Sequence, residues 1–194
     1  MKKIYLASSS PRRRELLNQI GIACEERPSD VDESALPGET PEHYVLRLAR
    51  EKALVCANRV AREGLVDLPI LAADTTVCAD GFILGKPESD ADAAAMLRRL
   101  SGRCHAVHTA VAVTQGGRVE VALSSTEVEF ADLSADAIAA YVASGEPQGK
   151  AGAYGIQGLA GVFVRRIAGS YSGVMGLPVY ETAQLLKQFG VILP

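Results

Sequence analysis

The stretch LASSSPRRRELLNQIG, residues 6–21, places a strand end, a turn and a helix in immediate succession. The apolar run at residues 4–7 predicts a strand, and Ser10 followed by Pro11 predicts the N-cap and first turn of a helix that ends at Gly21. Three arginines, residues 12–14, lie in that first turn, although the helix dipole favours acidic residues there. The stretch therefore predicts a strand-to-helix connection that receives an anion.

Outward from this connection, helical and strand patterns alternate along the chain. The sequence predicts further helices over residues 41–62, 90–100, 134–144 and 177–190. It predicts strands near residues 22–26, 69–74, 106–114, 119–130 and 162–167. The pairs Asp80-Gly81 and Gly116-Gly117 predict hairpin turns, whereas the intervening helices require crossovers. We therefore expect an α/β fold, a mixed twisted sheet with flanking helices.

Composition limits the classes of protein that the chain can belong to. Its 194 residues contain no repeat or linker, so we expect a single domain over residues 1–194. A net charge of -3 argues against a broad nucleic-acid-binding surface, which would need an excess of Lys and Arg. The N-terminal apolar run is too short for a signal peptide, and no stretch approaches the ~20 apolar residues of a membrane span. We expect a cytoplasmic protein without a membrane partner.

The cysteines and histidines do not form a recognisable ligand pattern. The cysteines lie far apart without a C-x-x-C pair, which favours isolated, buried thiols over a zinc or redox site. They are Cys24, Cys56, Cys78 and Cys104. His105 and His108 lie three residues apart in a predicted strand and so point to opposite faces. We expect both histidines to be structural.

Two cations fall on helix faces that should be buried. Arg13 lies near the centre of the stripe that Leu16, Leu17 and Ile20 form at helical spacing. Lys52 lies near the middle of the apolar face of the helix over residues 41–62. That face consists of Val45, Leu48, Ala49, Val55 and Cys56.

A buried cation is costly unless it is paired. One reading is that Arg13 and Lys52 pair with internal Asp or Glu, or extend to a rim. The other is that they face a water-filled cleft that binds an anion. Phosphate fits the second reading, because free N–H groups at a helix start and Arg side chains bind the same oxygens.

Asp74 follows an apolar run in ILAADTT, residues 70–76. At the end of a central strand it would face the crevice in which α/β folds bind ligands, as a metal ligand or general base. It could equally form a turn. The acidic loop of Asp30, Asp32 and Glu33 could supply a second ligand for a hard cation such as Mg²⁺, or could be only a solvated loop.

Two glycine-rich segments carry further candidate residues. GKP at residues 85–87 and GKAGAYGIQG at residues 149–158 contain Lys86, Lys150 and Gln157. The lysines offer charge to phosphate and the glutamine amide can read a base edge. Ordinary turns are the alternative. The sequence contains no P-loop, no G-x-G-x-x-G segment after a strand and no G-x-S-x-G elbow.

Taken in order, the motifs resemble the Maf family of nucleoside triphosphate pyrophosphatases over nearly the whole chain. The matching pieces are LASSSPRRRELL, VDES, LAREKA, AADTTV, GKP, LSGRCHAVHTAVAV, YVASGEPQGKAGAYGIQG and SYSGVMGLP. GAYGIQG and SYSGVMGLP are similar to the branch that acts on dTTP and UTP, not the branch associated with 7-methyl-GTP. The resemblance implies a Maf-like fold, similar to inosine triphosphate pyrophosphatases, with two lobes around a central cleft, and a homodimer.

The resemblance also implies roles for individual residues. Asp74 is expected to accept the proton of the attacking water, and a divalent cation, Mg²⁺ or Mn²⁺, is expected at Glu33 and Asp74. Arg12, Thr75 and Gln157 match positions that are tied to substrate choice. The other matched pocket positions are Ser8, Ser10, Arg13, Glu33, Lys52 and Lys86.

The implied activity is hydrolysis of dTTP and UTP at the α-phosphate, which yields a monophosphate and pyrophosphate and could remove non-standard nucleotides. One alternative is a regulator of cell division that senses nucleotide without turnover. A second is an enzyme that acts on modified or purine nucleotides, as inosine triphosphate pyrophosphatases do. The opening motif of that group pairs Ser with Asn and a downstream Lys, whereas this chain has Ser-Pro-Arg-Arg.

Overall fold

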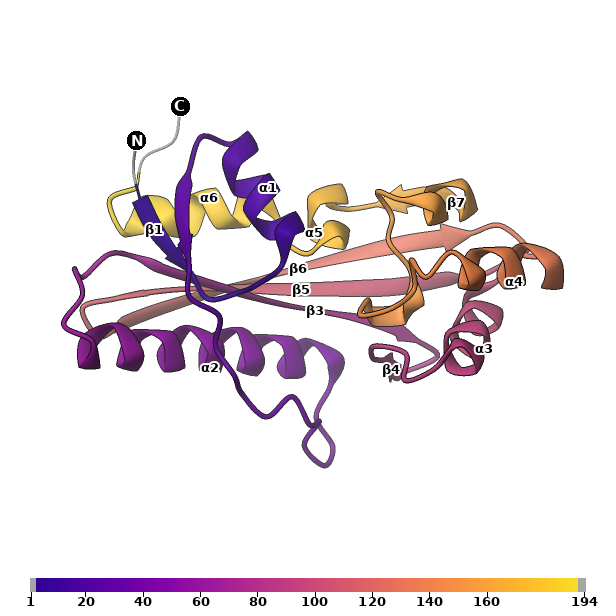
Figure 1. The fold of residues 1–194 in the computed structure, drawn as a ribbon, viewed down its shortest axis with the longest axis horizontal. Helices are drawn as coiled ribbons and strands as arrows, with labels where there is room; N and C mark the ends of the chain where they lie inside the picture. Colours follow the sequence, from indigo (N-terminus) through magenta and orange to yellow (C-terminus); the bar gives the residue numbers. More distant parts are fainter. Residues whose placement is uncertain (1–2, 192–194) are drawn as a thin grey trace.

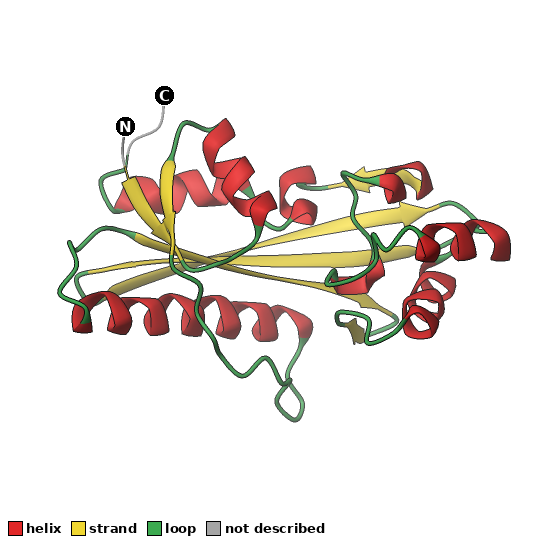
Figure 2. Ribbon diagram, in the orientation of Figure 1, coloured by secondary structure: helices red, strands yellow, loops and turns green. Residues whose placement is uncertain are grey.

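Three long antiparallel strands form the centre of the molecule (Figures 1 and 2). The computed structural model describes residues 3–191, so the first two and last three residues of the expected domain lie outside it. The central strands are β3 (Ile70–Ala79), β5 (Cys104–Gln115) and β6 (Arg118–Phe130). The expected turn at Gly116 and Gly117 joins β5 to β6, and both glycines have the positive φ that a tight hairpin requires.

Shorter strands extend this sheet on both sides. β1 (Lys3–Leu6) pairs in parallel with β2 (Ala23–Glu26) and with β3, whereas β4 (Phe82–Leu84) and β7 (Val164–Ala168) pair antiparallel with β3 and β6. The order is β2-β1-β3-β5-β6-β7, with β4 beside β3. Figure 1 shows β1 steeply inclined to β3. The sheet is therefore mixed and twisted, as the sequence predicted.

The two longest helices of the described chain have the predicted bounds. α2 (Pro41–Arg62) begins after Thr40, whose hydroxyl accepts from the His43 N–H at 3.3 Å. α3 (Asp90–Leu100) begins after Ser89, which accepts from the Asp92 N–H at 3.1 Å. The other predicted helices appear as α1 (Pro11–Gln19), α4 (Ala135–Ala143) and α6 (Val179–Gln188). The sequence did not predict α5 (Tyr171–Met175) or the 3₁₀ turns η1 (Ala151–Ala153) and η2 (Leu159–Phe163).

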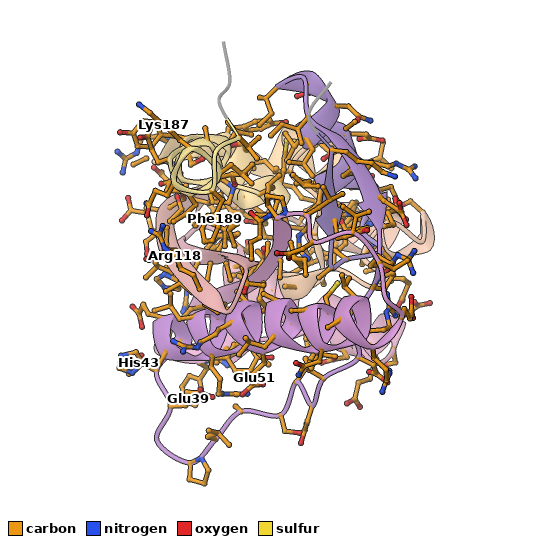
Figure 3. The ribbon with its side chains drawn as sticks, turned by 90° about the vertical axis from the view of Figure 1, so that its left-hand side faces the viewer. Glu39, His43, Glu51, Arg118, Lys187 and Phe189 are labelled. Carbon is orange, nitrogen blue, oxygen red and sulfur yellow. The ribbon has the colours of Figure 1, made fainter. Side chains whose placement is uncertain are left out.

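Residues that alternate along the strands pack against two helix layers, one on each face of the sheet. α2 covers one face, where Val45 and Ala49 pack against β1, β3 and β5. α1 and α6 cover the opposite face, where Leu17 and Leu186 pack on the intervening residues of the same strands. The prediction for Val55 was wrong: it is 41% exposed, because it lies at the margin of the α2 stripe. His43 and Glu51 project from the outer side of α2, away from the sheet (Figure 3).

A third core fills the far end of the long strands. Leu97 and Leu100 of α3 pack there with a set of aromatic rings in edge-to-face contact. The rings belong to His105, Phe130, Tyr141, Tyr154 and Phe163. The long strands therefore pass through two lobes, one built on α1, α2 and α6 and one on α3 and α4 (Figure 1). This confirms the two-lobed arrangement.

The histidines and cysteines lie mainly as predicted. His105 hydrogen-bonds the Tyr154 hydroxyl at 2.8 Å, and burial lowers its pKa to about 4. His108 bonds Ser125 at 2.8 Å on the opposite face. All four cysteines are free, but burial was predicted correctly only for Cys56: Cys24 and Cys78 are half-buried, and Cys104 is exposed at the start of β5. Within residues 3–191, no helix combines the length and the apolar character needed to cross a membrane.

Candidate active site

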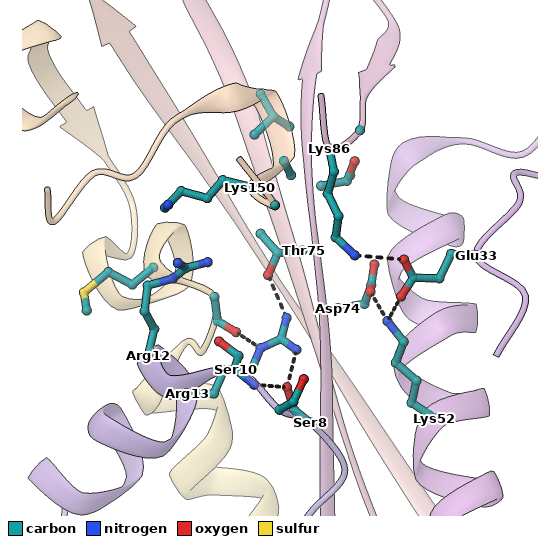
Figure 4. Close-up of a pocket in the computed structure, with 18 of the residues that line it drawn as sticks. Ser8, Ser10, Arg12, Arg13, Glu33, Lys52, Asp74, Thr75, Lys86 and Lys150 are labelled. Carbon is teal, nitrogen blue, oxygen red and sulfur yellow. Dashed lines mark hydrogen bonds and ion pairs between the residues drawn. The ribbon is translucent and has the colours of Figure 1, made fainter. Parts of the chain in front are cut away.

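The site lies where the sheet is open beside β3. β1 pairs with β3 at Ile70 and Leu71, and β4 pairs with β3 from Val77 onward. Between these pairings, residues 72–76 have β5 on one side and no strand of the described chain on the other. A cleft of about 610 Å³ occupies this gap (Figure 4).

Asp74 reaches this cleft from the middle of β3 and not from its end. The prediction of a strand-end carboxylate was wrong, because β3 continues through two threonines and a valine, residue types that favour strands, while it pairs with β5. Side chains alternate along the strand. Asp74 therefore points to the α2 side and Thr75 to the α1 side, and both line the cleft.

The α2 side of the cleft contains a chain of ion pairs. The Lys52 Nζ donates to Asp74 Oδ1 at 2.6 Å and to Glu33 Oε1 at 2.6 Å. The exposed Lys86 donates from its Nζ to Glu33 Oε2 at 3.2 Å. Lys52 and Asp74 are only 8% and 7% exposed, so their pairing is a buried one. Lys52 thus has internal acidic partners and also faces the cleft. The sequence had offered these as two alternatives, and the structure combines them.

The two carboxyl groups differ in acidity. Burial raises the pKa of Asp74 above its usual 3.8, although Lys52 and Arg13 act in the opposite direction. Partial burial alone would raise the pKa of Glu33 also, but Lys52 and Lys86 together bring it below its usual 4.5. A carboxylate with a raised pKa is a stronger proton acceptor. Asp74 is therefore the better suited of the two to act as a base.

Arg13 lies on the other side of β3 and is held by neutral oxygens. Its Nε donates to the Gly176 carbonyl at 2.8 Å, and its two terminal nitrogens donate to Ser8 Oγ at 3.1 Å and Thr75 Oγ1 at 3.4 Å. Thr75 also accepts from Thr109 at 2.9 Å. Loss of hydration lowers the pKa of Arg13. Because no carboxylate of residues 3–191 forms an ion pair with Arg13, its charge is open to an anion in the cleft.

The start of α1 completes this wall. Ser10 is the residue before the first helical turn, as predicted, but its side chain makes no capping bond and its N–H donates to Ser8 Oγ at 3.2 Å. Arg12 lines the cleft, whereas Arg14 points outside and pairs with Glu26 at 2.7 Å. Two of the three consecutive arginines therefore face the cleft.

Gln157 is the one proposed site residue that does not line the cleft. It is exposed in the loop between η1 and η2. Its role in substrate choice, which rests on the resemblance, stays a prediction. Of the acidic loop, Glu33 lines the cleft, whereas Asp30 and Asp32 do not.

The cleft also contains residues that the sequence analysis missed or left unassigned. Tyr44 lines it and donates its hydroxyl to the Glu33 carbonyl at 2.9 Å, and burial raises the pKa of Tyr44 to about 12. Tyr44 lies two turns before Lys52, so helical spacing could have found it. Tyr154, which no motif set apart from turn residues, lines the cleft from the glycine-rich segment, as does Lys150, which the sequence had suggested as a charge for phosphate.

The donor set fits a divalent cation that shares its ligands with a substrate. Asp74 and Glu33 converge on the same Lys52 Nζ, so their hard oxygens lie close together. In residues 3–191, no three His, Cys, Asp or Glu side chains are grouped to hold a metal. Mg²⁺ commonly binds one or two carboxylates and completes its shell with substrate phosphates and water. The two carboxylates match that pattern.

The charges of the cleft define the class of ligand it can bind. Two carboxylates line it, Glu33 and Asp74. The basic residues are Arg12, Arg13, Lys52, Lys86 and Lys150. Five cations against two acids, beside helix α1, favour a polyanion such as a phosphate chain. The molecule is thus an α/β protein with a polyanion-binding cleft at an open strand edge.

Comparison with known proteins identifies the family. The model of the Maf family, described as Maf-like protein, matches residues 3–189, and the chain belongs to this family. A Methylobacillus flagellatus protein named dTTP/UTP pyrophosphatase is 62% identical over 100% of this chain and 96% of its own length. A protein of the same name from Chromobacterium violaceum is 58% identical over 99% of this chain and 97% of its own length.

Among solved structures, the Staphylococcus aureus Ham1 protein aligns with 68% of this chain and 73% of its own. The TM-score is 0.45 and the sequence identity 17%. The strand order and helix layers of this chain itself define its fold.

Proposed function

We propose that this chain hydrolyses pyrimidine nucleoside triphosphates, dTTP and UTP, at the α-phosphate and releases a nucleoside monophosphate and pyrophosphate. The observation that carries the proposal is a buried carboxyl, Asp74, with a raised pKa at the edge of a cleft rich in cations. The relatives named dTTP/UTP pyrophosphatase, similar over the full chain, support the choice of substrate.

In this proposal Asp74 accepts a proton from the attacking water. Lys52 donates to Oδ1 of the carboxylate at 2.6 Å and so orients the group at the cleft. The water oxygen forms a bond to the α-phosphorus, and the bond from that phosphorus to the oxygen bridging to the β-phosphorus breaks. Arg13 and Lys86 stabilise the charge that develops on the phosphoryl oxygens, where such reactions gain most of their acceleration.

We propose that Asp74 and Glu33 hold a divalent cation, Mg²⁺ or Mn²⁺, together with the substrate phosphates. When bound, such a cation neutralises phosphate charge and polarises the scissile phosphoryl group. The convergence of both carboxylates on Lys52 supports this assignment. Removal of the metal with EDTA is expected to abolish turnover, and added Mg²⁺ or Mn²⁺ to restore it.

Thr75 and Arg12 are proposed to take part in substrate choice, together with Gln157. Thr75 and Arg12 line the cleft on the side away from Asp74. The resemblance to the dTTP and UTP branch supports all three. A panel of nucleoside triphosphates tests the choice: dTTP and UTP should be hydrolysed faster than purine or methylated guanosine triphosphates.

The substitution Asp74→Asn tests the mechanism. Turnover should fall by about 10²–10⁴-fold, the usual contribution of a general base, while nucleotide binding is largely retained. Asp32→Asn is the matched control, because Asp32 is an exposed neighbour of Glu33 that does not line the cleft. Full activity of Asp74→Asn, or release of orthophosphate in place of pyrophosphate, would contradict the mechanism.

The same panel separates hydrolysis from the alternative function, a regulator of cell division. Tight nucleotide binding without release of pyrophosphate would favour the regulator. We also propose, on the family resemblance alone, that the chain works in the cytoplasm as a homodimer and removes non-standard nucleotides. Light scattering of the purified chain measures its oligomeric state.

A further inference from the structure

The basic residues of the cleft differ in their ion pairing on the two sides of β3. On the α2 side, Lys52 pairs with both cleft carboxylates and Lys86 pairs with Glu33. On the α1 side, the cleft is lined by Arg12, Arg13 and Lys150, and no carboxylate of the described chain forms an ion pair with any of them. The cations that form no ion pair therefore lie across β3 from Asp74 (Figure 4).

Arg12 and Lys150 approach each other from separate elements. Arg12 extends from the first turn of α1, and Lys150 extends from the residue before η1 (Figure 4). Burial lowers the pKa of Lys150, and the positive charge of Arg12 lowers it further, while the Glu146 carboxylate acts in the opposite direction. The two side chains are therefore close enough to repel each other, and an anion between them would remove that repulsion.

Lys150 is fixed in this position by neutral groups. Its Nζ donates to the backbone carbonyl of Glu146. Its carbon chain lies on Gly155, where an added Cβ would be 3.0 Å from the Lys150 Cε. Gly155 therefore makes room for the lysine. The chain thus holds a cation beside Arg12, and its one acidic neighbour among the described residues, Glu146, acts on it from beyond ion-pair distance.

We propose that Arg12 and Lys150 form the subsite that binds the β- and γ-phosphoryl groups of the substrate and then the released pyrophosphate. The assignment rests on the proposed function. In phosphoryl transfer the attacking and leaving oxygens lie roughly in line through phosphorus. Since Asp74 marks the side from which water attacks, the leaving group lies on the opposite side, where Arg12 and Lys150 are placed.

Calorimetric titration of the full chain with inorganic pyrophosphate and, separately, with UMP tests the subsite. Lys150→Met should weaken pyrophosphate binding by about tenfold, the usual cost of a lost charged hydrogen bond, and change UMP binding by less than about twofold. Lys150→Arg should keep most of the pyrophosphate affinity. Lys187→Met, which removes an exposed cation on α6, should leave both affinities unchanged.

Gly155→Ala gives a second test of the subsite, because it keeps the charge of Lys150 and displaces its carbon chain. This variant too should weaken the binding of pyrophosphate more than the binding of UMP. The subsite is wrong if wild-type chain does not bind pyrophosphate, or if Lys150→Met binds it as wild type does or loses both ligands equally. Failure of the proposed function shows separately, as absence of pyrophosphate release by the wild-type chain in the nucleotide panel.

Discussion

At the scale of single residues, the pair of Lys52 and Asp74 combines a structural cost with a chemical use. Two charges in the interior are expensive unless each is well paired. Lys52 meets Asp74 and Glu33 at 2.6 Å each, yet burial still raises the pKa of Asp74. The interior therefore holds this carboxylate in a state that favours taking up a proton.

The direction of this shift predicts the pH dependence of activity. A general base works only when ionised, so kcat/KM should fall as the pH drops through the raised pKa of Asp74. The acidic limb is expected above pH 3.8, the usual pKa of aspartate. A pH profile of kcat/KM for dTTP measures it, with circular dichroism at each pH as a check on folding. An acidic limb of kcat/KM at or below pH 3.8 would contradict the role of Asp74 as the base.

Removal of Lys52 should lower the free energy of unfolding by an amount that depends on pH. Lys52→Met leaves the Asp74 carboxylate buried beside a methyl group, and the free energy of unfolding is expected to fall by about 3 kcal/mol at pH 7. The pKa of Asp74 rises further in the variant, so the loss should shrink at acidic pH, where the carboxyl is neutral. Urea unfolding at pH 7 and in mild acid measures both values.

The matched control for this loss is Lys187→Met, since Lys187 is exposed and should change stability by less than about 0.5 kcal/mol. The double variant Lys52→Met with Asp74→Asn should recover part of the loss, because it removes the unpaired charge. A loss of the same size at both pH values would show that Asp74 is not its source.

At the scale of elements, the turn η1 connects the two lysine-bearing segments to β3. The Gly152 N–H donates to the Gly85 carbonyl at 3.0 Å, which joins GKAG to GKP. Gly152 has φ +67, and an added Cβ would lie 2.8–2.9 Å from three side-chain atoms of Val77. Only glycine meets both conditions, and the position of Lys150 and Lys86 in the cleft depends on it.

Gly152→Ala is therefore expected to lower the free energy of unfolding by at least about 2 kcal/mol, from a left-handed backbone and a clash with Val77 together. Gly81→Ala isolates the first effect, since Gly81 has φ +78 and no atom within 4 Å of an added Cβ; it should cost about 1 kcal/mol. Thermal unfolding compares them. Equal losses would mean that Val77 adjusts and that the contact with β3 is not tight.

At the scale of the whole molecule, local rules predicted the elements that carry a clear period or cap. α2 and α3 have the expected bounds because Thr40 and Ser89 cap them and apolar spacing persists to their ends. α5 has five residues, too few to show a helical period, and it exists because it packs between α1 and the long strands.

The candidate site was predictable where one element determines it. Helical spacing alone put Arg13 and Lys52 on inward faces, and both line the cleft. The place of Asp74 within its strand depended on the pairing of β3 with β5, which a single segment does not encode. The exposure of Gln157 and the approach of Lys150 to Arg12 depend on the path of a loop across another element.

The open edge of β3 also bears on how such a molecule can change over generations. Asp74 and Thr75 are neighbours in the chain, yet one meets α2 and the other meets α1 and β5. Substitutions around Thr75 can reshape what the cleft admits without disturbing the ion pair of Asp74 with Lys52. Related proteins can therefore differ in the substrates they accept while they keep the same ion-paired carboxylate.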